Sequence, residues 1–174
     1  MSDEIKKYET LKTHFREDYK WEFDKKMYID NKTSYMLVLV SFLLSLLLNF
    51  FSNNNVVSYL KDIPTVILVF RCIIIFLYVG ATTLCVISIF MYVIVLISRK
   101  YHILSNEKIF TKLDNDEESY ENTVKLLATD YQRVAKHNNE INRKVIGKYK
   151  VATVLALIAM IITVIIFVLR FLMG

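Results

Sequence analysis

One uninterrupted apolar stretch, residues 66–98, restricts what this chain can fold into more than any other feature. Arg71 is its only charged residue. A helix that crosses a hydrocarbon core of roughly 30 Å needs about 20 consecutive apolar residues. The stretch is longer than that, yet too short for two spans and a turn. It therefore predicts one membrane-spanning helix with its core at 72–97. An interfacial lead-in at 64–71 precedes this core, and Arg71 reaches the headgroups from it.

The composition is typical of a membrane protein with charged flanks. Hydrophobic residues make up 55% of the 174 residues, and the net charge is +5. Only 3 Gly and 1 Pro interrupt the chain, which favours long helices over turns. Cys72 and Cys85 both lie in the apolar stretch, and we expect them to be reduced packing residues rather than a disulfide or a metal site. Residues 1–33 are strongly polar, so a cleaved secretory leader is not expected.

Two further apolar segments, residues 35–51 and 151–173, predict two more spans. Each of the three segments carries small or polar side chains at helical spacing. These are Ser41, Ser45 and Asn49 in the first, Ala81, Cys85 and Ser88 in the second, and Ala152, Ala156, Ala159 and Thr163 in the third. Such faces permit close approach of helices. For the first segment two interpretations remain, namely hydrogen bonding between helices and the lining of a water path.

Two charged segments lead into spans, and both have helical periodicity. In residues 3–33, an aromatic-rich stripe with steps of three and four predicts a face that packs against another helix. It comprises Tyr8, Leu11, Phe15, Tyr19, Phe23, Met27 and Asp30. In residues 117–150, a heptad seam alternates by four and three. It comprises Tyr120, Val124, Leu127, Tyr131, Val134, Asn138, Ile141 and Val145. Asn138 either fixes the register of this seam or contacts a ligand.

The distribution of basic residues predicts the orientation in the membrane. Lys and Arg are concentrated in 1–33 and 99–150, and the opposite side has only Lys61, Arg71 and Arg170. This asymmetry predicts a cytoplasmic N-terminus and an external C-terminus. We therefore expect an all-α membrane protein with three transmembrane helices and long parallel cytoplasmic helices that form a stalk. The expected parts are a cytoplasmic amphipathic helix (1–33), two transmembrane helices with a short external loop (34–98), a cytoplasmic helical segment (99–150) and a third transmembrane helix (151–174).

No catalytic constellation is present in the sequence, because the three histidines are isolated and no phosphate-binding loop, HExxH or nucleophile elbow occurs. We expect neither an enzyme nor a metal or cofactor site. The candidate ligand-binding residues are a basic, amide-rich run and a charged motif before the first span. They are Asp30, Lys32, Arg133, Asn138, Asn139, Asn142 and Arg143. The arginines would meet a phosphate and the asparagines a base or ribose. The alternative is a basic collar that attracts anionic lipid headgroups.

Two motifs carry a resemblance to a known family. Tyr28-Ile-Asp30-Asn-Lys32-Thr-Ser34 precedes the first span. The second motif contains Tyr120, Leu127, Asp130-Tyr131, Asn138, Ile141 and Lys148-Tyr149-Lys150, and it enters the third span. An Asp-x-Lys before the first span and a helix that closes on Lys-Tyr before the last one resemble the transmembrane effectors of bacterial Pycsar antiphage systems. The resemblance implies a multi-pass protein of the bacterial inner membrane. It also implies that a cyclic pyrimidine mononucleotide, such as cUMP or cCMP, is sensed in the cytoplasm and triggers membrane disruption.

Functions of different classes therefore remain open. The first is a homo-oligomeric effector of a nucleotide-signalling antiviral defence system, which acts by oligomerisation or pore formation in the lipid bilayer. The alternative is a scaffolding membrane protein whose helical stalk binds a protein partner. A transporter or holin-like pore is less favoured, because the stalk is long and the spans lack interior charges. Nucleic acid is not an expected partner, since acidic residues interleave with basic ones.

Overall fold

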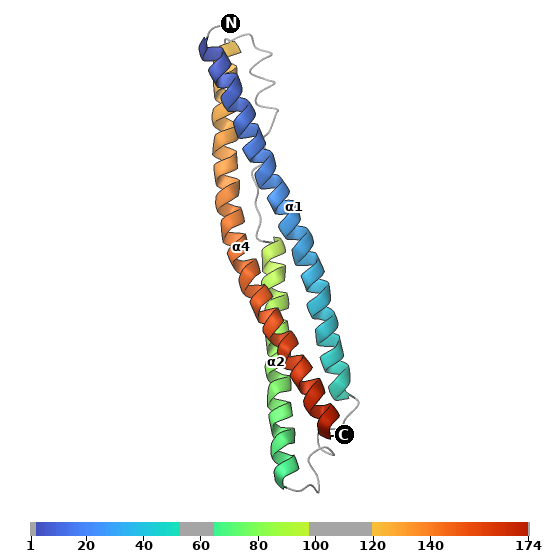
Figure 1. Cartoon of the computed structure of the whole chain (residues 1–174). Coiled ribbons are helices and arrows are strands. Elements are labelled where there is room, and N and C mark those ends of the chain that lie inside the picture. The colour runs from blue at the N-terminus through green and yellow to red at the C-terminus, as the bar shows by residue number, and fades with distance from the viewer. Residues whose placement is uncertain (1–2, 53–64, 98–119, 174) are drawn as a thin grey trace. The chain divides into compact units, whose positions relative to one another are not determined.

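The computed structural model describes residues 3–52, 65–97 and 120–173, and these residues form three helices (Figure 1). They are α1 (Asp3–Ser52), α2 (Thr65–Ile97) and α4 (Tyr120–Met173). The described residues thus confirm the all-helical class. The predicted external loop and the segment 99–119, with its acidic run, lie outside the described residues.

Each of these helices is long and apolar enough to cross a membrane, which is compatible with a multi-pass membrane protein. α2 begins at Thr65, so the predicted lead-in before Arg71 is already helical. At 1.5 Å per residue α2 is about 50 Å long. This exceeds the roughly 30 Å of a hydrocarbon core, so α2 either tilts or extends beyond the core.

α1 and α4 each continue without a break from a charged segment into an apolar one. Neither contains proline, and Gly147 is the only glycine within either helix. A glycine inside a helix costs about 1 kcal/mol relative to alanine, which these long helices tolerate. Two compact units divide the chain, and the division falls inside both helices. The first unit comprises Met1–Asp30 and Arg99–Ile146, and the second comprises Asn31–Ser98 and Gly147–Gly174.

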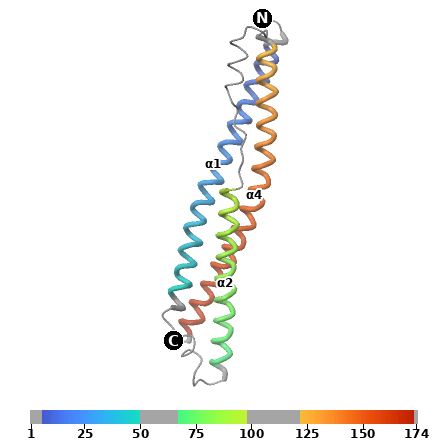
Figure 2. Tube along the Cα trace, turned by 180° about the vertical axis from the view of Figure 1, so that it is seen from behind, coloured from blue at the N-terminus to red at the C-terminus, as the bar shows by residue number. Residues whose placement is uncertain are grey.

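In the second unit, parts of α1, α2 and α4 lie side by side around an apolar core (Figure 2). Its fully buried members are Val40, Leu47, Ile74, Ala81, Cys85, Tyr92, Ala152, Ala156, Ala159 and Ile166. Hydrogen bonds join α2 to α4. The Ser88 hydroxyl donates to the carbonyl of Ala152 at 3.2 Å, and the Tyr92 hydroxyl donates to the Thr153 hydroxyl oxygen at 3.1 Å.

The small-residue faces predicted for the second and third spans are confirmed as packing faces. Ala81, Cys85 and Ser88 are fully buried, and so is the alanine stripe of α4. Small side chains let helix backbones approach closely, which is how spans gain packing energy in lipid. The polar stripe of the first span does not pack against the other helices within the described residues, and both of its interpretations, hydrogen bonding between helices and the lining of a water path, stay predictions. Its members are exposed on α1, which instead buries Val40 and Leu47.

In the first unit, α1 and α4 run in the same direction and pack along one seam. Lys125 lies over the ring of Tyr8, and Tyr131 meets Tyr19 edge-on at 6.0 Å between ring centroids. The predicted heptad seam of α4 is confirmed, because each of its members described is buried or half-buried. It includes Asn138, which is 1% exposed.

The aromatic stripe predicted on α1 is correct as far as Tyr19 and again at Asp30, which are half-buried, and it is wrong between them. Phe23 and Met27 are 37% and 52% exposed, and Glu22 and Ile29 are buried in their place. Successive steps of four advance about 40° per step around a helix with 3.6 residues per turn. Beyond Tyr19 the buried face of α1 continues in alternating steps of three and four, through Glu22 to Ile29. It therefore separates from the predicted stripe, which continues in steps of four.

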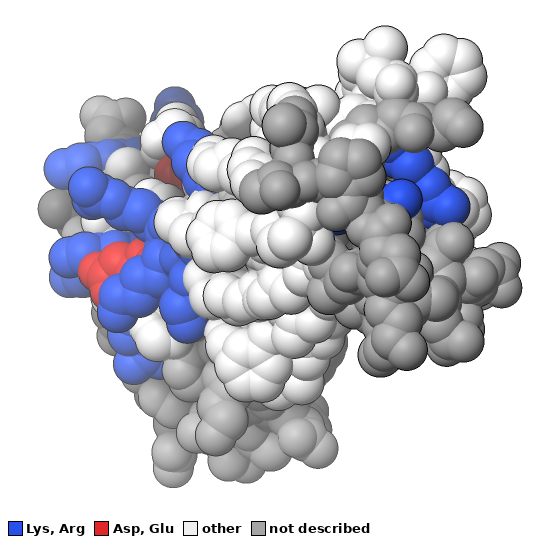
Figure 3. Space-filling model, turned by 90° about the horizontal axis from the view of Figure 1, so that it is seen from below, with Lys and Arg blue, Asp and Glu red and all other residues white. Residues whose placement is uncertain are grey.

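Charge is absent from most of the surface formed by the apolar segments. Figure 3 shows a broad patch of side chains that are neither basic nor acidic. The apolar parts of the described helices contain only Arg71 and Arg170 as charged residues, and both are half-buried. Such surfaces belong in lipid or against another protein.

Candidate functional site

The structure places the seven predicted site residues in different environments. Asn138 and Asn142 are each 1% exposed and lie one turn apart on α4. Arg133, Asn139 and Arg143 are exposed on the same helix. Arg133 is already ion-paired, with its Nη2 at 2.9 Å from Asp130 Oδ1. The predicted run thus divides into a buried amide pair and an exposed polar face.

The charged motif before the first span is divided between the two units. Asp30 is half-buried and is the last α1 residue of the first unit, and Lys32 is exposed and belongs to the second unit. Arg133 and Arg143 are ten residues apart, which is about 15 Å along a helix axis. One phosphate is therefore poorly placed to contact both arginines.

A buried carboxylate on α1 accepts hydrogen bonds from both helices of the first unit. It is not among the predicted site residues. Glu22 on α1 is 5% exposed. Asn142 Nδ2 donates to its Oε2 at 2.7 Å and to its backbone carbonyl at 3.0 Å. Lys25 Nζ donates to Oε1 at 2.7 Å. Each carboxylate oxygen therefore has a donor, as a buried charge requires.

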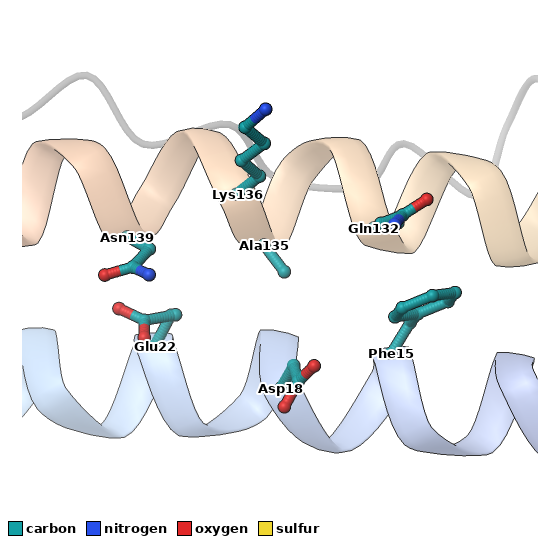
Figure 4. A pocket seen from close by; sticks show the side chains of 7 residues that line it. All are labelled: Phe15, Asp18, Glu22, Gln132, Ala135, Lys136 and Asn139. Carbon is teal, nitrogen blue, oxygen red and sulfur yellow. The ribbon is translucent and has the colours of Figure 1, made fainter.

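A cavity of about 340 Å³ lies between α1 and α4 beside this carboxylate. Its lining residues are Phe15, Asp18, Glu22, Gln132, Ala135, Lys136 and Asn139 (Figure 4). Asn139 and Glu22 face each other across it, the Phe15 ring lies at the opposite end, and Lys136 extends from the rim away from α1 (Figure 4). The volume is at the lower end of the range for small-molecule sites.

Of the predicted residues, Asn139 lines the cavity. Arg143 lies four residues further along α4, in the series Gln132, Lys136, Asn139, Arg143 that shares one helix face by spacing. A sequence signal for Glu22 did exist. The steps from Phe15 to Tyr19 and from Tyr19 to Glu22 are four and three residues. This heptad spacing predicts that the Glu22 carboxylate lies on the same buried helix face as the two aromatic rings.

The chemistry of the cavity is that of a flat, hydrogen-bonding ligand. Phe15 offers a ring for stacking. The amides of Gln132 and Asn139 can each donate and accept, and the carboxylates of Asp18 and Glu22 can only accept when ionised. Lys136 is the single cation in the lining. A ligand that carries N–H donors on a ring and an anionic group at the rim would match these groups.

The fold and the cavity define an all-helical protein with three helices long and apolar enough to span a membrane, and with a polar cavity in the unit that contains its charged helical segments. No family model, no curated protein and no solved structure matches the chain.

Proposed function

We propose that this protein is a membrane effector of a bacterial nucleotide-signalling defence system. Its first unit lies in the cytoplasm, binds a cyclic mononucleotide in the α1–α4 cavity, and triggers loss of membrane integrity. The cytoplasmic placement rests on the excess of Lys and Arg in the segments before the first and third spans. The cavity is the observation that carries the proposal, because it joins a ring surface, two amides and a cation within one helical pair.

The ligand would enter with its base between Phe15 and the facing pair Asn139 and Glu22. Carboxylates accept hydrogen bonds from the exocyclic amino group of cytosine, whereas uracil presents an oxygen at that position. Asp18 and Glu22 therefore favour a cytosine base over a uracil base. The cyclic phosphate would lie toward the rim, where Lys136 provides the nearest cation of the lining.

Binding would be transmitted through the helices that form the cavity. α1 and α4 each contribute residues to both units, so a change in their packing at the cavity would be passed along the same two helices. The ligand can shift the equilibrium between a resting and an active packing of the helices only by the difference between its affinities for the two packings. A tight ligand that bound both packings equally would not activate the protein.

Leakage from dye-loaded liposomes tests the proposal. Purified full-length protein is reconstituted and challenged with cCMP, cUMP and a panel of other cyclic mono- and dinucleotides. We expect leakage with one cyclic mononucleotide, and cCMP before cUMP. Leakage that is equal for all nucleotides, or absent for all of them, contradicts the proposal.

Two exposed lysines on α4 provide a matched pair of variants. Lys136 lines the cavity and Lys144 does not. Lys136→Ala should weaken the nucleotide response at least tenfold, and Lys144→Ala should leave it unchanged. Equal losses in both variants would indicate a general basic collar that attracts anionic lipid, which responds to salt and not to nucleotide identity.

A scaffolding function is the second candidate, and a different observation favours it. Trp21 and Tyr28 are 62% and 59% exposed and lie seven residues apart on one face of α1. Large aromatic residues are enriched in protein–protein interfaces. Pull-down of one defined protein that is lost in Trp21→Ala, combined with no leakage under any nucleotide, would favour this function over the first.

A further inference from the structure

Within the second unit, α2 and α4 run in opposite directions along a common seam (Figure 1). Two of the contacts between them define the register of this seam. The rings of Tyr92 and Tyr149 lie 5.9 Å apart between centroids, and Ser88 donates to the carbonyl of Ala152. A step of four residues back along α2 thus corresponds to a step of three residues forward along α4. Alternating steps of this kind are typical of helices that pack along one another.

The same alternation of three and four continues to the other end of the α2–α4 seam. On α2 it passes through Cys85, Ala81, Tyr78 and Ile74, and on α4 through Ala156, Ala159, Thr163 and Ile166. All of these residues are buried apart from Tyr78, which is half-buried. Ile74 and Ile166 belong to the same core. The next positions of the seam are Arg71, three residues before Ile74, and Arg170, four residues after Ile166.

Arg71 and Arg170 therefore occupy facing positions on the two helices. Both residues are half-buried, and the Nε atom of Arg71 is buried. The axes of packed helices lie about 8–10 Å apart, so two arginine side chains can reach one group between them. Two guanidinium charges at facing positions repel each other, and the repulsion is stronger beside a hydrocarbon core than in water. An anion between the two groups replaces this repulsion by two attractions.

The position of the arginine pair along the helices indicates which anion is available. Arg71 is 21 residues from Tyr92, and Arg170 is 21 residues from Tyr149. At 1.5 Å per residue this separation is about 32 Å, close to the roughly 30 Å of a hydrocarbon core. Tyrosine and arginine are both typical of the membrane boundary. With the tyrosine pair at one boundary, the arginine pair lies at the other, where the phosphates of lipid headgroups are the abundant anions.

We propose that Arg71 and Arg170 together bind the phosphate of one phospholipid, which holds α2 against α4 at this end of the seam. A guanidinium group presents a planar fork of donors that matches two phosphate oxygens. Two such groups, one from each helix, contact one phosphate from both sides. Free phosphate has the same chemistry, but the depth of the pair favours the lipid. The site is formed by the second unit alone and does not depend on the nucleotide proposal.

Lipid binding to the full-length protein tests the site. The purified protein is delipidated in dodecyl maltoside and titrated with dioleoyl phosphatidylglycerol, and the lipid-bound fraction is measured by native mass spectrometry. Arg71→Gln and Arg170→Gln should each weaken binding of one lipid by about tenfold or more, because each removes a charge-assisted pair. Lys150→Gln is the matched control, because Lys150 is exposed on α4 near the other end of the seam, and it should leave the affinity unchanged. Unchanged affinity in either arginine variant overturns the proposal, since the two residues then do not act together.

Two further ligands separate the sources of the interaction. Dioleoylglycerol has the same acyl chains without phosphate, and inorganic phosphate has the anion without the chains. Both should bind at least tenfold more weakly than phosphatidylglycerol. Equal binding of dioleoylglycerol would mean that acyl contacts and not the phosphate form the site. Equal binding of inorganic phosphate would make a free anion the ligand and overturn the assignment to a lipid.

Thermal unfolding of the same samples, followed by circular dichroism, gives a readout whose sign changes with lipid. In delipidated protein Arg71→Gln should raise the unfolding midpoint, because it removes one of two facing charges. Phosphatidylglycerol should raise the midpoint of the original protein and of Lys150→Gln, but not that of Arg71→Gln or Arg170→Gln. If the arginine variants lower the midpoint without lipid, a group of the chain itself already supplies the anion, and the proposal is wrong.

Discussion

Asn142 on α4 donates hydrogen bonds to both the backbone carbonyl and the carboxylate of Glu22 on α1, at 3.0 and 2.7 Å. This pair fixes the two helices in register at a defined point, because a one-residue slip would leave a buried carboxylate without its donor. Lys25 holds the other carboxylate oxygen. Polar groups in a helical seam cost stability and define register, so Asn142 has the kind of register role that was one of the two alternatives predicted for Asn138.

Replacing Asn142 by leucine should lower the free energy of unfolding by about 2 kcal/mol, since a hydrogen bond to a charged group contributes about 1.5–3 kcal/mol. Loss of helical circular dichroism on titration with SDS measures this. Asn139→Leu is the control, because Asn139 is exposed on the same helix, and it should change stability by less than about 0.5 kcal/mol. The double variant Glu22→Met/Asn142→Leu should recover most of the loss, since it removes the buried charge together with its donor. A double variant less stable than Asn142→Leu would contradict this account.

Much of the fold could be predicted from the sequence, because apolar length and small-residue spacing are local signals. The three apolar segments and the buried alanine stripe of α4 required only hydropathy and periodicity. The predicted phase of the α1 seam is wrong at Phe23 because the prediction assumes that aromatic residues are the buried ones. In the structure Phe23 is exposed, and the polar Glu22 is buried because α4 supplies a partner for it. A partner on another helix cannot be read from the spacing of one segment.

The site was less predictable for the same reason. Among the α4 residues that line the cavity, Asn139 is the one that belongs to the predicted ligand-binding residues. The α1 side, Phe15 with Asp18 and Glu22, became recognisable only when both helices were seen together. Arg133 and Arg143 suggested a phosphate site by composition, but their separation along one helix does not support a shared contact.

The membrane orientation gives a prediction that depends only on charge distribution. A cysteine introduced at Asn54 in the background lacking Cys72 and Cys85 should react with an impermeant maleimide added outside intact cells. A cysteine at Asn115 should react only after the membrane is opened, because short segments rich in Lys and Arg are generally retained in the cytoplasm. The reverse labelling pattern would reject the assignment and, with it, access of a cytoplasmic nucleotide to the cavity.

The small-residue face of α4 should not tolerate a larger side chain. Ala159 is fully buried in the core of the second unit, so Ala159→Leu adds volume where helices are in close contact. Overpacking typically costs about 1–3 kcal/mol, measured by the same SDS titration. Val154→Leu, at an exposed position of the same helix, should be nearly neutral. Equal effects of the two variants would show that the Ala159 face is not a packing face in the membrane.

Two variants of Tyr92 measure separately how much packing and hydrogen bonding contribute to the stability of the second unit. Its side chain is fully buried, its hydroxyl donates to the Thr153 hydroxyl oxygen at 3.1 Å, and the Thr153 hydroxyl donates to the carbonyl of Tyr149 at 2.9 Å. Hydrogen bonds between membrane helices average about 0.6 kcal/mol. Tyr92→Phe should therefore lower the free energy of unfolding by less than about 1 kcal/mol. Tyr92→Ala leaves a cavity and should cost about 3–5 kcal/mol, as other large aromatic truncations do. A loss in Tyr92→Phe as large as that in Tyr92→Ala would mean that the hydroxyl network, and not the packing of the ring, holds α2 against α4.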